Sequence, residues 1–500
     1  MKTQRRCTNS GLTFIAPLSD HCQMNYCDQH NTPLADALLE EVAKKRLPFD
    51  VPGHKGNASY LRDFFGDACV MKDLNSRKDI DYLCEPRGVI RDAEALAAKA
   101  FHAKDAFFMV GGTTSSVQTM IMSACAPGDK IILPRNVHSS VINAVILSGA
   151  TPVYLNPGIH KELGISLGVS LLEVTSVIEK NRDAKAVFLN NPTYYGICSD
   201  LKDIVKLAHA NGMKVLVDEA HGTHFYFHEA LPATAMEEGA DMSAISIHKT
   251  GGSLTQSSMI LSSGTIPSEH IGRVMNLTMT TSASYLLMAS LDLARKNLAL
   301  NGRAELDRIL PLCRETRKSI NEIGGFWAFG KDIVVNENVF DYDETKLSIQ
   351  TIGIGLPGVK VYDILRDEFG IQLEFGDMNN VLALATIGDR AEYHTALVDA
   401  LRRIKTRYGT ERRNNFDYEY IPPQVAIPPR EAFYSEKIKL PIRECKGRIS
   451  GAFVMCYPPG IPILAPGEVI TEEIISHILN AEEEGCSLNG LSGADLLVLK

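Results

Sequence analysis

One lysine of this chain, Lys249, lies among small, hydroxylated and glycine residues in the segment 243–258, which reads SAISIHKTGGSLTQSS. A lysine amine without bulky neighbours can form a Schiff base with an aldehyde. The hydroxyls and backbone N–H groups around it can hold a phosphate. A lysine taken alone is more often a solvated residue of a Gly/Ser turn, so the neighbouring motifs must decide between the two interpretations.

A carboxylate follows the short apolar segment 214–217, which predicts a buried strand. Asp218 would then lie at the carboxyl end of that strand, where α/β sheets bind their ligands. A carboxylate in this place can pair with the pyridine nitrogen of pyridoxal phosphate (PLP) and keep it protonated, so that the ring accepts electrons from the substrate. Lys249 and Asp218 together therefore indicate PLP as cofactor.

A glycine-rich turn, GGTTSS at residues 111–116, connects the apolar strand-like segment 107–110 to the helix-like segment 117–124. A turn of this kind at the start of a helix presents free N–H groups to an anion. The hydroxyls of Thr114 and Ser115 suit the cofactor phosphate. Alone, such a turn is at least as often purely structural, so the prediction depends on the order of the three motifs along the chain.

These motifs resemble those of the Orn/Lys/Arg decarboxylases, bacterial PLP enzymes of fold type I. The resemblance covers nearly the whole chain and indicates the short branch of the family, without an N-terminal receiver-like domain. The other matching segments are VPGHKG (51–56), EPRGVI (85–90), RNVH (135–138), NPTYYG (191–196), TTSASY (280–285) and YPPGIP (457–462).

The resemblance implies a role for several side chains. Lys249 would bind the cofactor covalently, Asp218 would pair with the ring nitrogen, and Ala220 would pack beneath the ring. His138 would stack on the opposite face of the ring, and His221 would lie close to the reacting centre. The catalytic residues implied are Lys249, His138 and His221, and the residues implied to contact the phosphate are Thr114, Ser115, Ser246 and His248.

The resemblance also implies an active site at a subunit interface. Thr280, Thr281 and Ser282 would be offered to the phosphate of the neighbouring subunit, so Thr281 and Ser282 are expected to bind cofactor and the protein to be a dimer-based homo-oligomer.

The implied reaction is α-decarboxylation of a small, basic L-amino acid. Arginine, giving agmatine and CO2 for the polyamine pathway, is expected first, with lysine and then ornithine as alternatives. Glu374 or Asp377 could bind the guanidinium, although acids in such a segment are more often surface residues on a strand edge. An aminotransferase or aldolase of the same fold and a catalytically silent paralogue stay open, the latter because residues 451–453 and Lys437 depart from the family pattern.

Composition restricts the remaining choices. The chain has 500 residues, 45% of them hydrophobic, which is enough for a large core and several domains. A net charge of −9 argues against nucleic acid as a partner. The eleven cysteines include no CxxC pair, so neither a metal site nor a disulfide framework is expected. No stretch has the apolar length or flanks of a membrane span or signal peptide, so we expect a cytoplasmic protein.

The alternation of apolar and helical segments predicts an α/β protein with the fold type I PLP-transferase architecture. A large domain with a mostly parallel sheet is expected at 51–300, after an N-terminal extension and helix at 1–50. A small α+β domain at 301–412 and a C-terminal decarboxylase domain at 413–500 complete the predicted division. We also expect a long helix over 281–300 and a charged linker over 402–415.

Overall fold

The computed structural model describes residues 28–411, 421–456, 460–483 and 485–500. Most of the predicted N-terminal extension and the start of the YPPGIP turn lie outside the described residues. Within the described part, a seven-stranded sheet forms the centre of the molecule, with strand order β1-β10-β9-β8-β6-β2-β3. The bounds of these strands are Asp105–Met109 (β1), Ser258–Ser262 (β10), Met242–Ile245 (β9), Lys214–Asp218 (β8), Ala186–Asn190 (β6), Lys130–Pro134 (β2) and Thr151–Leu155 (β3).

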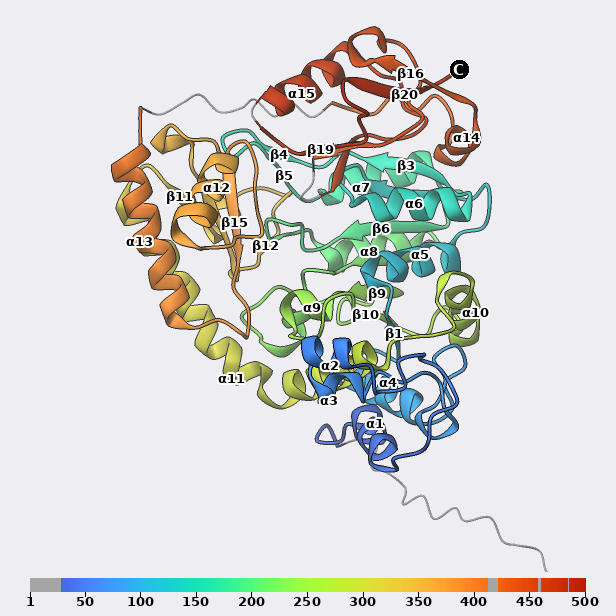
Figure 1. Cartoon of the computed structure of the whole chain (residues 1–500). Coiled ribbons are helices and arrows are strands. Elements are labelled where there is room, and N and C mark those ends of the chain that lie inside the picture. The colour runs from blue at the N-terminus through green and yellow to red at the C-terminus, as the bar shows by residue number, and fades with distance from the viewer. Residues whose placement is uncertain (1–27, 412–420, 457–459, 484) are drawn as a thin grey trace, which may run out of the picture.

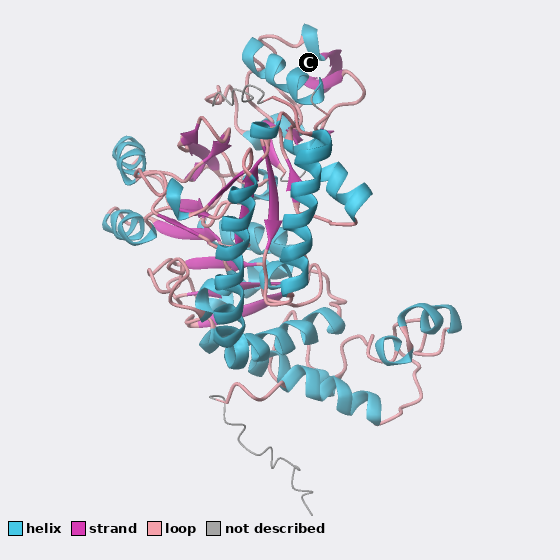
Figure 2. Ribbon diagram, turned by 90° about the vertical axis from the view of Figure 1, so that its left-hand side faces the viewer, coloured by secondary structure: helices cyan, strands magenta, loops and turns pink. Residues whose placement is uncertain are grey.

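The sheet is mostly parallel, as predicted, because β10 alone is antiparallel to its two neighbours in it. Helices follow the strands and pack on the sheet, as the views in Figures 1 and 2 show. The helices of this large unit are α1 (Pro33–Ala43), α2 (Ser59–Phe65), α3 (Asp67–Val70), α4 (Val89–Ala100), α5 (Gly112–Ala124), α6 (Ser139–Ser148), α7 (Leu171–Lys180), α8 (Leu201–Ala210), α9 (Ile247–Thr250) and α10 (Ser268–Thr278).

Local signals place the starts of several of these helices. The Ser170 hydroxyl accepts the backbone N–H of Glu173 at the start of α7, and Asp200 accepts that of Asp203 at the start of α8. Helix α5 differs, because its first N–H groups have no side-chain cap. Those donors face the carboxyl ends of the strands, which is the edge of the sheet where α/β proteins bind ligands.

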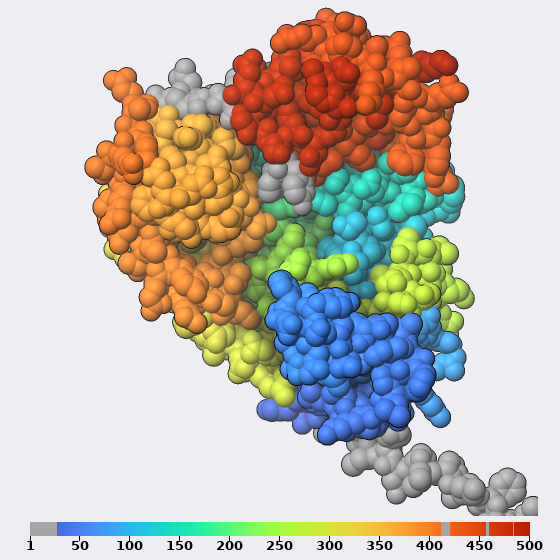
Figure 3. All heavy atoms as spheres, in the orientation of Figure 1, coloured from blue at the N-terminus to red at the C-terminus, as the bar shows by residue number. Residues whose placement is uncertain are grey.

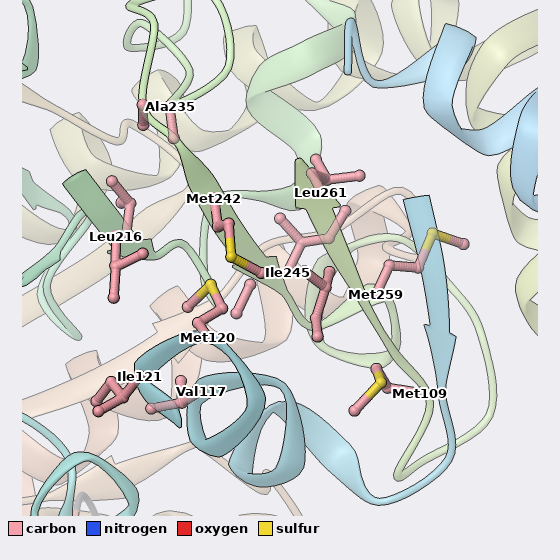
Figure 4. Close-up of a cluster of buried hydrophobic side chains, with 14 of the residues drawn as sticks. Met109, Val117, Met120, Ile121, Leu216, Ala235, Met242, Ile245, Met259 and Leu261 are labelled. Atoms are coloured by element: carbon pink, nitrogen blue, oxygen red, sulfur yellow. The ribbon is translucent and has the colours of Figure 1, made fainter. Parts of the chain in front are cut away.

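The core of the large unit is apolar. Figure 4 shows part of it, where α5 contributes Val117, Met120 and Ile121 against strands β1, β8, β9 and β10. The strand residues labelled there, including Leu216, Ile245 and Met259, are as fully buried as those of the helix. This packing holds α5 and the carboxyl ends of β8 and β9 in a fixed relation.

The long helix α11 (Tyr285–Ile323) corrects the expectation of a helix over 281–300. It begins four residues later, after a Ser284 cap, and continues through Pro311 well beyond residue 300. The continuation is stabilised by buried apolar side chains, among them Leu306, Ile309 and Ile320. One helix thus crosses the predicted boundary between the large and small domains.

The small unit contains an antiparallel sheet of order β11-β13-β15-β14, covered by α12 (Gly358–Phe369) and α13 (Ala391–Tyr408). The charged segment expected to be a linker is only partly so, because residues 402–408 form the last turns of α13, whose apolar positions are buried. Residues 412–415 lie outside the described part. The strands are β11 (Trp327–Phe329), β13 (Lys346–Gln350), β14 (Phe375–Gly376) and β15 (Asn380–Leu384).

The C-terminal unit has its own apolar cluster, which includes Ile442, Val454 and Ile478. Figure 3 shows it in red above the large unit. A buried ion pair joins the two, since Arg135 after β2 lies 2.9 Å from Glu468. Its elements are α14 (Pro429–Tyr434), β16 (Lys437–Pro441), β17 (Val454–Cys456), β18 (Ile461–Leu464), α15 (Glu472–Glu483), β19 (Leu488–Asn489) and β20 (Asp495–Leu499).

Short pairs complete the fold: β4 (Ile159–His160) with β5 (Ile165–Ser166), and β7 (Ile197–Cys198) with β12 (Asp341–Tyr342). The second pair connects the large and small units. The domain division at residues 50, 300 and 412 stays a prediction.

Candidate active site

Lys249 lies on the short helix α9, between the central sheet and the small unit (Figure 1). Its amine is 3.0 Å from Nε2 of His221 and 5.4 Å from the ring centre of Tyr194. Burial lowers the pKa of the Lys249 amine, while the carboxylates of Asp218 and Glu374 act in the opposite direction. The amine is therefore easier to deprotonate than that of an exposed lysine, as a nucleophilic lysine requires.

His221 follows β8 and lies between two lysines. Its Nε2 faces Lys249, and its Nδ1 is 3.0 Å from the amine of Lys346, a fully buried residue at the start of β13. Burial lowers the pKa of His221 well below its usual value, and the two lysines lower it further. The imidazole is thus neutral near pH 7 and has one N–H donor and one acceptor nitrogen.

Asp218 is the last residue of β8, where the sequence placed it. One carboxylate oxygen accepts the backbone N–H of Ala220 at 3.1 Å. Burial raises the pKa of Asp218, and the charge of Lys249 opposes this rise. Ala220 itself is buried, so a larger side chain there would have to displace its neighbours.

His138 is the N-cap of α6, and its Nδ1 accepts the backbone N–H of Ser140 at 3.2 Å. Burial lowers the pKa of His138 to about 4, and the charge of Lys249 adds to the effect. The ring is therefore neutral near pH 7, with its proton on Nε2. A neutral flat ring held by a backbone contact is suited to stack on a planar ligand.

A cluster of hydroxyls lies at the start of α5. Ser246 contacts Thr113, and Ser258 lies 3.0 Å from Thr113 and 2.9 Å from Ser116. Two residues predicted to contact phosphate lie nearby and differ in exposure and hydrogen bonding. Thr114 is exposed, whereas Ser115 is buried and donates to the carbonyl of Gly112 at 2.9 Å. His248 has its Nδ1 2.8 Å from the carbonyl oxygen of Ser257.

Thr280, Thr281 and Ser282 lie before α11 and are exposed. Within this one chain they take no part in the cluster around Lys249. Exposure is what a contact with a second subunit would require.

The two acids considered for a guanidinium lie in different settings. Glu374 is exposed, yet its charge raises the pKa values of Lys249 and Lys346. Asp377 accepts the Tyr195 hydroxyl and the backbone N–H groups of Asn379 and Asn380. Asp377 also lines a cavity of about 350 Å³ beside Tyr194.

Three side chains of this cluster were not singled out from the sequence. Tyr194 lies in a segment that carried the family resemblance, and its ring centre is 4.6 Å from that of His221. Thr113 belongs to the GGTTSS turn. The NPTYYG segment could therefore have indicated Tyr194, and the GGTTSS turn could have indicated Thr113. Lys346 has no such signal, because it lies in an ordinary alternating strand pattern of the small unit.

The part of the chain that the structure describes contains no group of three or more His, Cys, Asp and Glu side chains arranged to hold a metal. Its helices are also all too short or too polar to cross a bilayer.

Two family models match the chain. The major domain of the Orn/Lys/Arg decarboxylases matches residues 32–393, and their C-terminal domain matches residues 414–492. The chain belongs to the Orn/Lys/Arg decarboxylase family. It is therefore an enzyme of the amino-acid decarboxylase class, and the aminotransferase alternative is not supported. The family is PLP-dependent, as are its fold type I structural neighbours.

Individual relatives agree with this assignment. The arginine decarboxylase of Bacillus subtilis (strain 168) is 42% identical over 479 residues, covering 94% of this chain and 98% of that protein. The lysine decarboxylase LdcA of Pseudomonas aeruginosa is 25% identical and covers 92% of this chain and 76% of that protein. The structure of the Escherichia coli constitutive lysine decarboxylase has a TM-score of 0.80 at 21% identity, with 94% of this chain and 82% of that chain covered. These similarities confirm the predicted α/β fold type I architecture.

Proposed function

We propose that this protein is a PLP-dependent decarboxylase that converts arginine into agmatine and CO2, a reaction that feeds polyamine synthesis. The observation that carries the proposal is the placement of Lys249, Asp218 and His221 at one edge of the sheet. The family supplies the reaction class. Arginine is favoured because the relatives at 40–42% identity are named arginine decarboxylases, whereas the lysine decarboxylases among the relatives are 24–25% identical.

The residues present fit PLP. The N–H groups of the first turn of α5 beyond Gly112, whose own N–H donates to the Gln256 carbonyl, and the hydroxyls of Thr113 and Ser246 supply donors for a phosphate. Thr114, Ser115 and His248 lie close enough in the chain to add to them. Asp218 supplies a carboxylate for the ring nitrogen, and Lys249 supplies the amine for covalent attachment. Bound there, PLP would supply an electron sink for the pair left when the substrate loses CO2.

The protein groups around this place have separate tasks. Asp218 would hold a proton on the ring nitrogen, which requires the carboxylate to be ionised when the cofactor is bound. His138, neutral because of burial, would stack on one face of the ring, and Ala220 would leave room for the other face. Lys249 would accept and return protons at its Nζ, with His221 in hydrogen-bond contact.

Glu374 is the acid we propose to bind the substrate guanidinium. Its charge already acts on Lys249 and Lys346, and among the described residues it makes no ion pair. The carboxylate of Asp377, in contrast, is held by Tyr195 and two backbone N–H groups. Asp377 is therefore better suited to shape the cavity than to bind a cation.

A dimer-based assembly is part of the proposal. The segment from Leu47 to Phe65 leaves large apolar side chains in solvent, with Phe49 96% and Phe64 81% exposed. This N-terminal part forms a surface lobe, blue in Figure 3. A second subunit would cover such a surface and would bring Thr281 and Ser282 to its partner's phosphate site. A stable, fully active monomer in gel filtration would contradict the assembly.

A cytoplasmic location is also proposed. The buried cysteines Cys125, Cys198 and Cys313 are in no disulfide, which agrees with a reducing compartment.

The experiment that tests the function is a product assay. Purified protein is incubated with PLP and, separately, with arginine, lysine and ornithine, and CO2 and the amine products are measured. We expect agmatine from arginine at the highest kcat/KM. A preference for lysine or ornithine would overturn the substrate, keto-acid release would indicate an aminotransferase, and no turnover of any substrate would indicate a silent paralogue.

A further inference from the structure

The side chains of Lys249, His221 and Lys346 form a hydrogen-bonded series in which the charge of the two amines is restricted. Both amines are 3.0 Å from a ring nitrogen of His221, one on each side. A neutral imidazole can accept a hydrogen bond at one nitrogen only. If both lysines were charged, one of them would face the imidazole N–H with three N–H donors and no lone pair. One of the two amines must therefore be neutral and accept.

The surroundings of Lys346 decide which amine keeps its charge. The carboxylate of Asp343 is fully buried, and its Oδ2 has no hydrogen-bond partner. Despite burial, which raises it, the pKa of Asp343 is lowered to about 2 by His224 and by Lys346. The Nε2 of His224 lies 3.2 Å from Oδ1 of Asp343, but the buried Nδ1 of His224 has no hydrogen-bond partner, so a charged imidazole there would leave an N–H unsatisfied. Asp343 is thus a buried anion for which Lys346 is the better-suited cation, and burial without a cation would be costly.

The carboxylates near Lys249 compensate a charge less well. Burial raises the pKa of Asp218, and Glu374 is exposed to solvent, which screens its charge. The charged amine is accordingly that of Lys346, and the neutral one that of Lys249.

The backbone at Gly196 leaves space for the side chain of Lys346. Gly196 has φ +88°, and a Cβ at this position would lie 2.7 Å from Cγ of Lys346. Only glycine adopts this conformation without strain and also leaves space for the lysine stem. An apolar side chain could fill the space beside Gly196 without burying a charge. Space filling alone therefore does not explain a lysine at position 346.

From this geometry we infer that Lys346 is a positioning residue, which donates to Nδ1 of His221 and thereby fixes the tautomer that presents Nε2–H to the neutral amine of Lys249. Lys346 would reach the reaction through His221 and would touch neither cofactor nor substrate. The inference deepens the proposed function and rests on it for its purpose, but its test needs no turnover.

The first test measures the protonation of Lys249 in full-length protein freed of PLP. The amine is labelled with trace acetic anhydride across a pH series, and the acetylated Lys249 peptide is quantified by mass spectrometry. In Lys346→Met the imidazole loses its Nδ1 donor and can accept at Nε2 from a charged Lys249. We expect the labelling midpoint to rise by about one pH unit, which lowers the labelling rate near pH 7 about tenfold.

A double-variant comparison separates the tautomer from simple charge repulsion. In a His221→Phe background, Lys346→Met should shift the midpoint much less than in the wild-type background. An equal shift in both backgrounds, or none in either, would overturn the inference. The exposed lysine of α12 gives a matched control, since Lys360→Met should leave the Lys249 midpoint unchanged.

The groups that also face these three residues are present in every variant and cancel in the comparison; they are Asp218, Glu374, Asp343, His224, His138 and Cys198.

A second measurement needs no substitution and so does not depend on whether a variant folds. Neutron diffraction from deuterated, PLP-free crystals of the wild-type protein locates the proton on His221. A deuteron on Nε2 with none on Nδ1 supports the inference, and a deuteron on Nδ1 refutes it. Loss of decarboxylase activity in the product assay would refute the proposed function but leave both of these readings unaffected.

Discussion

Two buried regions of the molecule differ in chemistry. The core beside α5 is lined by residues such as Met120 and Leu216, whereas the edge of the same sheet holds His221 and, from the small unit, Lys346 and Asp343. Apolar burial stabilises the fold by about 25 cal/mol per Å², whereas burying a charge costs free energy unless it is paired. Stability thus originates in the first region and reactivity in the second, so substitutions should separate the two properties.

The largest expected effect is on kcat and concerns the catalytic edge, the edge of the sheet beside Lys249, His221 and Asp218. Lys249→Ala should lower kcat by about 10³-fold or more, because the nucleophilic amine is lost. The melting temperature should change little, because the substitution removes a partly buried amine whose charged form is already disfavoured by burial. The measurements are CO2 release and thermal unfolding of the same preparation. Substantial remaining activity would show that another residue has the role given to Lys249.

The opposite behaviour is expected in the core. Leu216→Ala should lower the free energy of unfolding by about 2–5 kcal/mol, because it leaves a cavity in close-packed surroundings. The kcat measured well below the unfolding transition should stay near that of the wild type. Urea denaturation checks the first value, with Leu293→Ala on the exposed side of α11 as a matched control. A large loss of kcat with unchanged stability would erase the distinction between the regions.

One carboxyl departs from the apolar character of the core. Glu94 on α4 is buried and accepts the backbone N–H of Phe108, and burial raises the pKa of Glu94 to about 8. Because the folded pKa exceeds the unfolded one, its contribution to stability is present at low pH and is lost as the pH rises from about 4.5 through 8, by about 1.4 kcal/mol per pH unit.

Glu94→Gln removes this titration and keeps an acceptor for Phe108. The variant should therefore be more stable than the wild type by a few kcal/mol at pH 8 and nearly equal to it at pH 5. Denaturation curves at both pH values give the difference, and Glu40→Gln, on the exposed face of α1, should show none. A stability difference that did not grow with pH would mean that Glu94 is ionised in the folded protein.

The smallest expected effect concerns substrate choice at the catalytic edge. Glu374→Gln should raise KM for arginine about tenfold with kcat changed much less, since one charge-assisted contact to the guanidinium is lost. Steady-state kinetics with arginine give both constants. Glu392→Gln, an exposed substitution at the start of α13, is the control. A fall of kcat at constant KM would place Glu374 in the chemistry rather than in binding.

Much of this arrangement was predictable from the chain. The strands that carry Asp218 and precede the GGTTSS turn are present as expected, because each is a short apolar run bounded by turn residues. The predicted end of the helix at residue 300 was wrong. Pro311 lies within α11, and buried contacts to the small unit outweigh the helix-breaking effect of this proline. Thr113, which sequence reasoning did not single out, contacts Ser246 and Ser258, whereas the phosphate contacts of Thr114 and Ser115 stay predictions.

Local motifs could be identified from residue order alone: the lysine among small residues, the carboxylate at a strand end and the glycine-rich turn at a helix start. Each depends on neighbours within a few positions, so residue type and spacing suffice to predict it. The contact between Lys346 and His221 became visible in the folded chain alone, because the two residues lie in different units joined by α11 and the β7–β12 pair. Contacts between such distant segments follow from how packed surfaces fit together, and no local pattern encodes that fit.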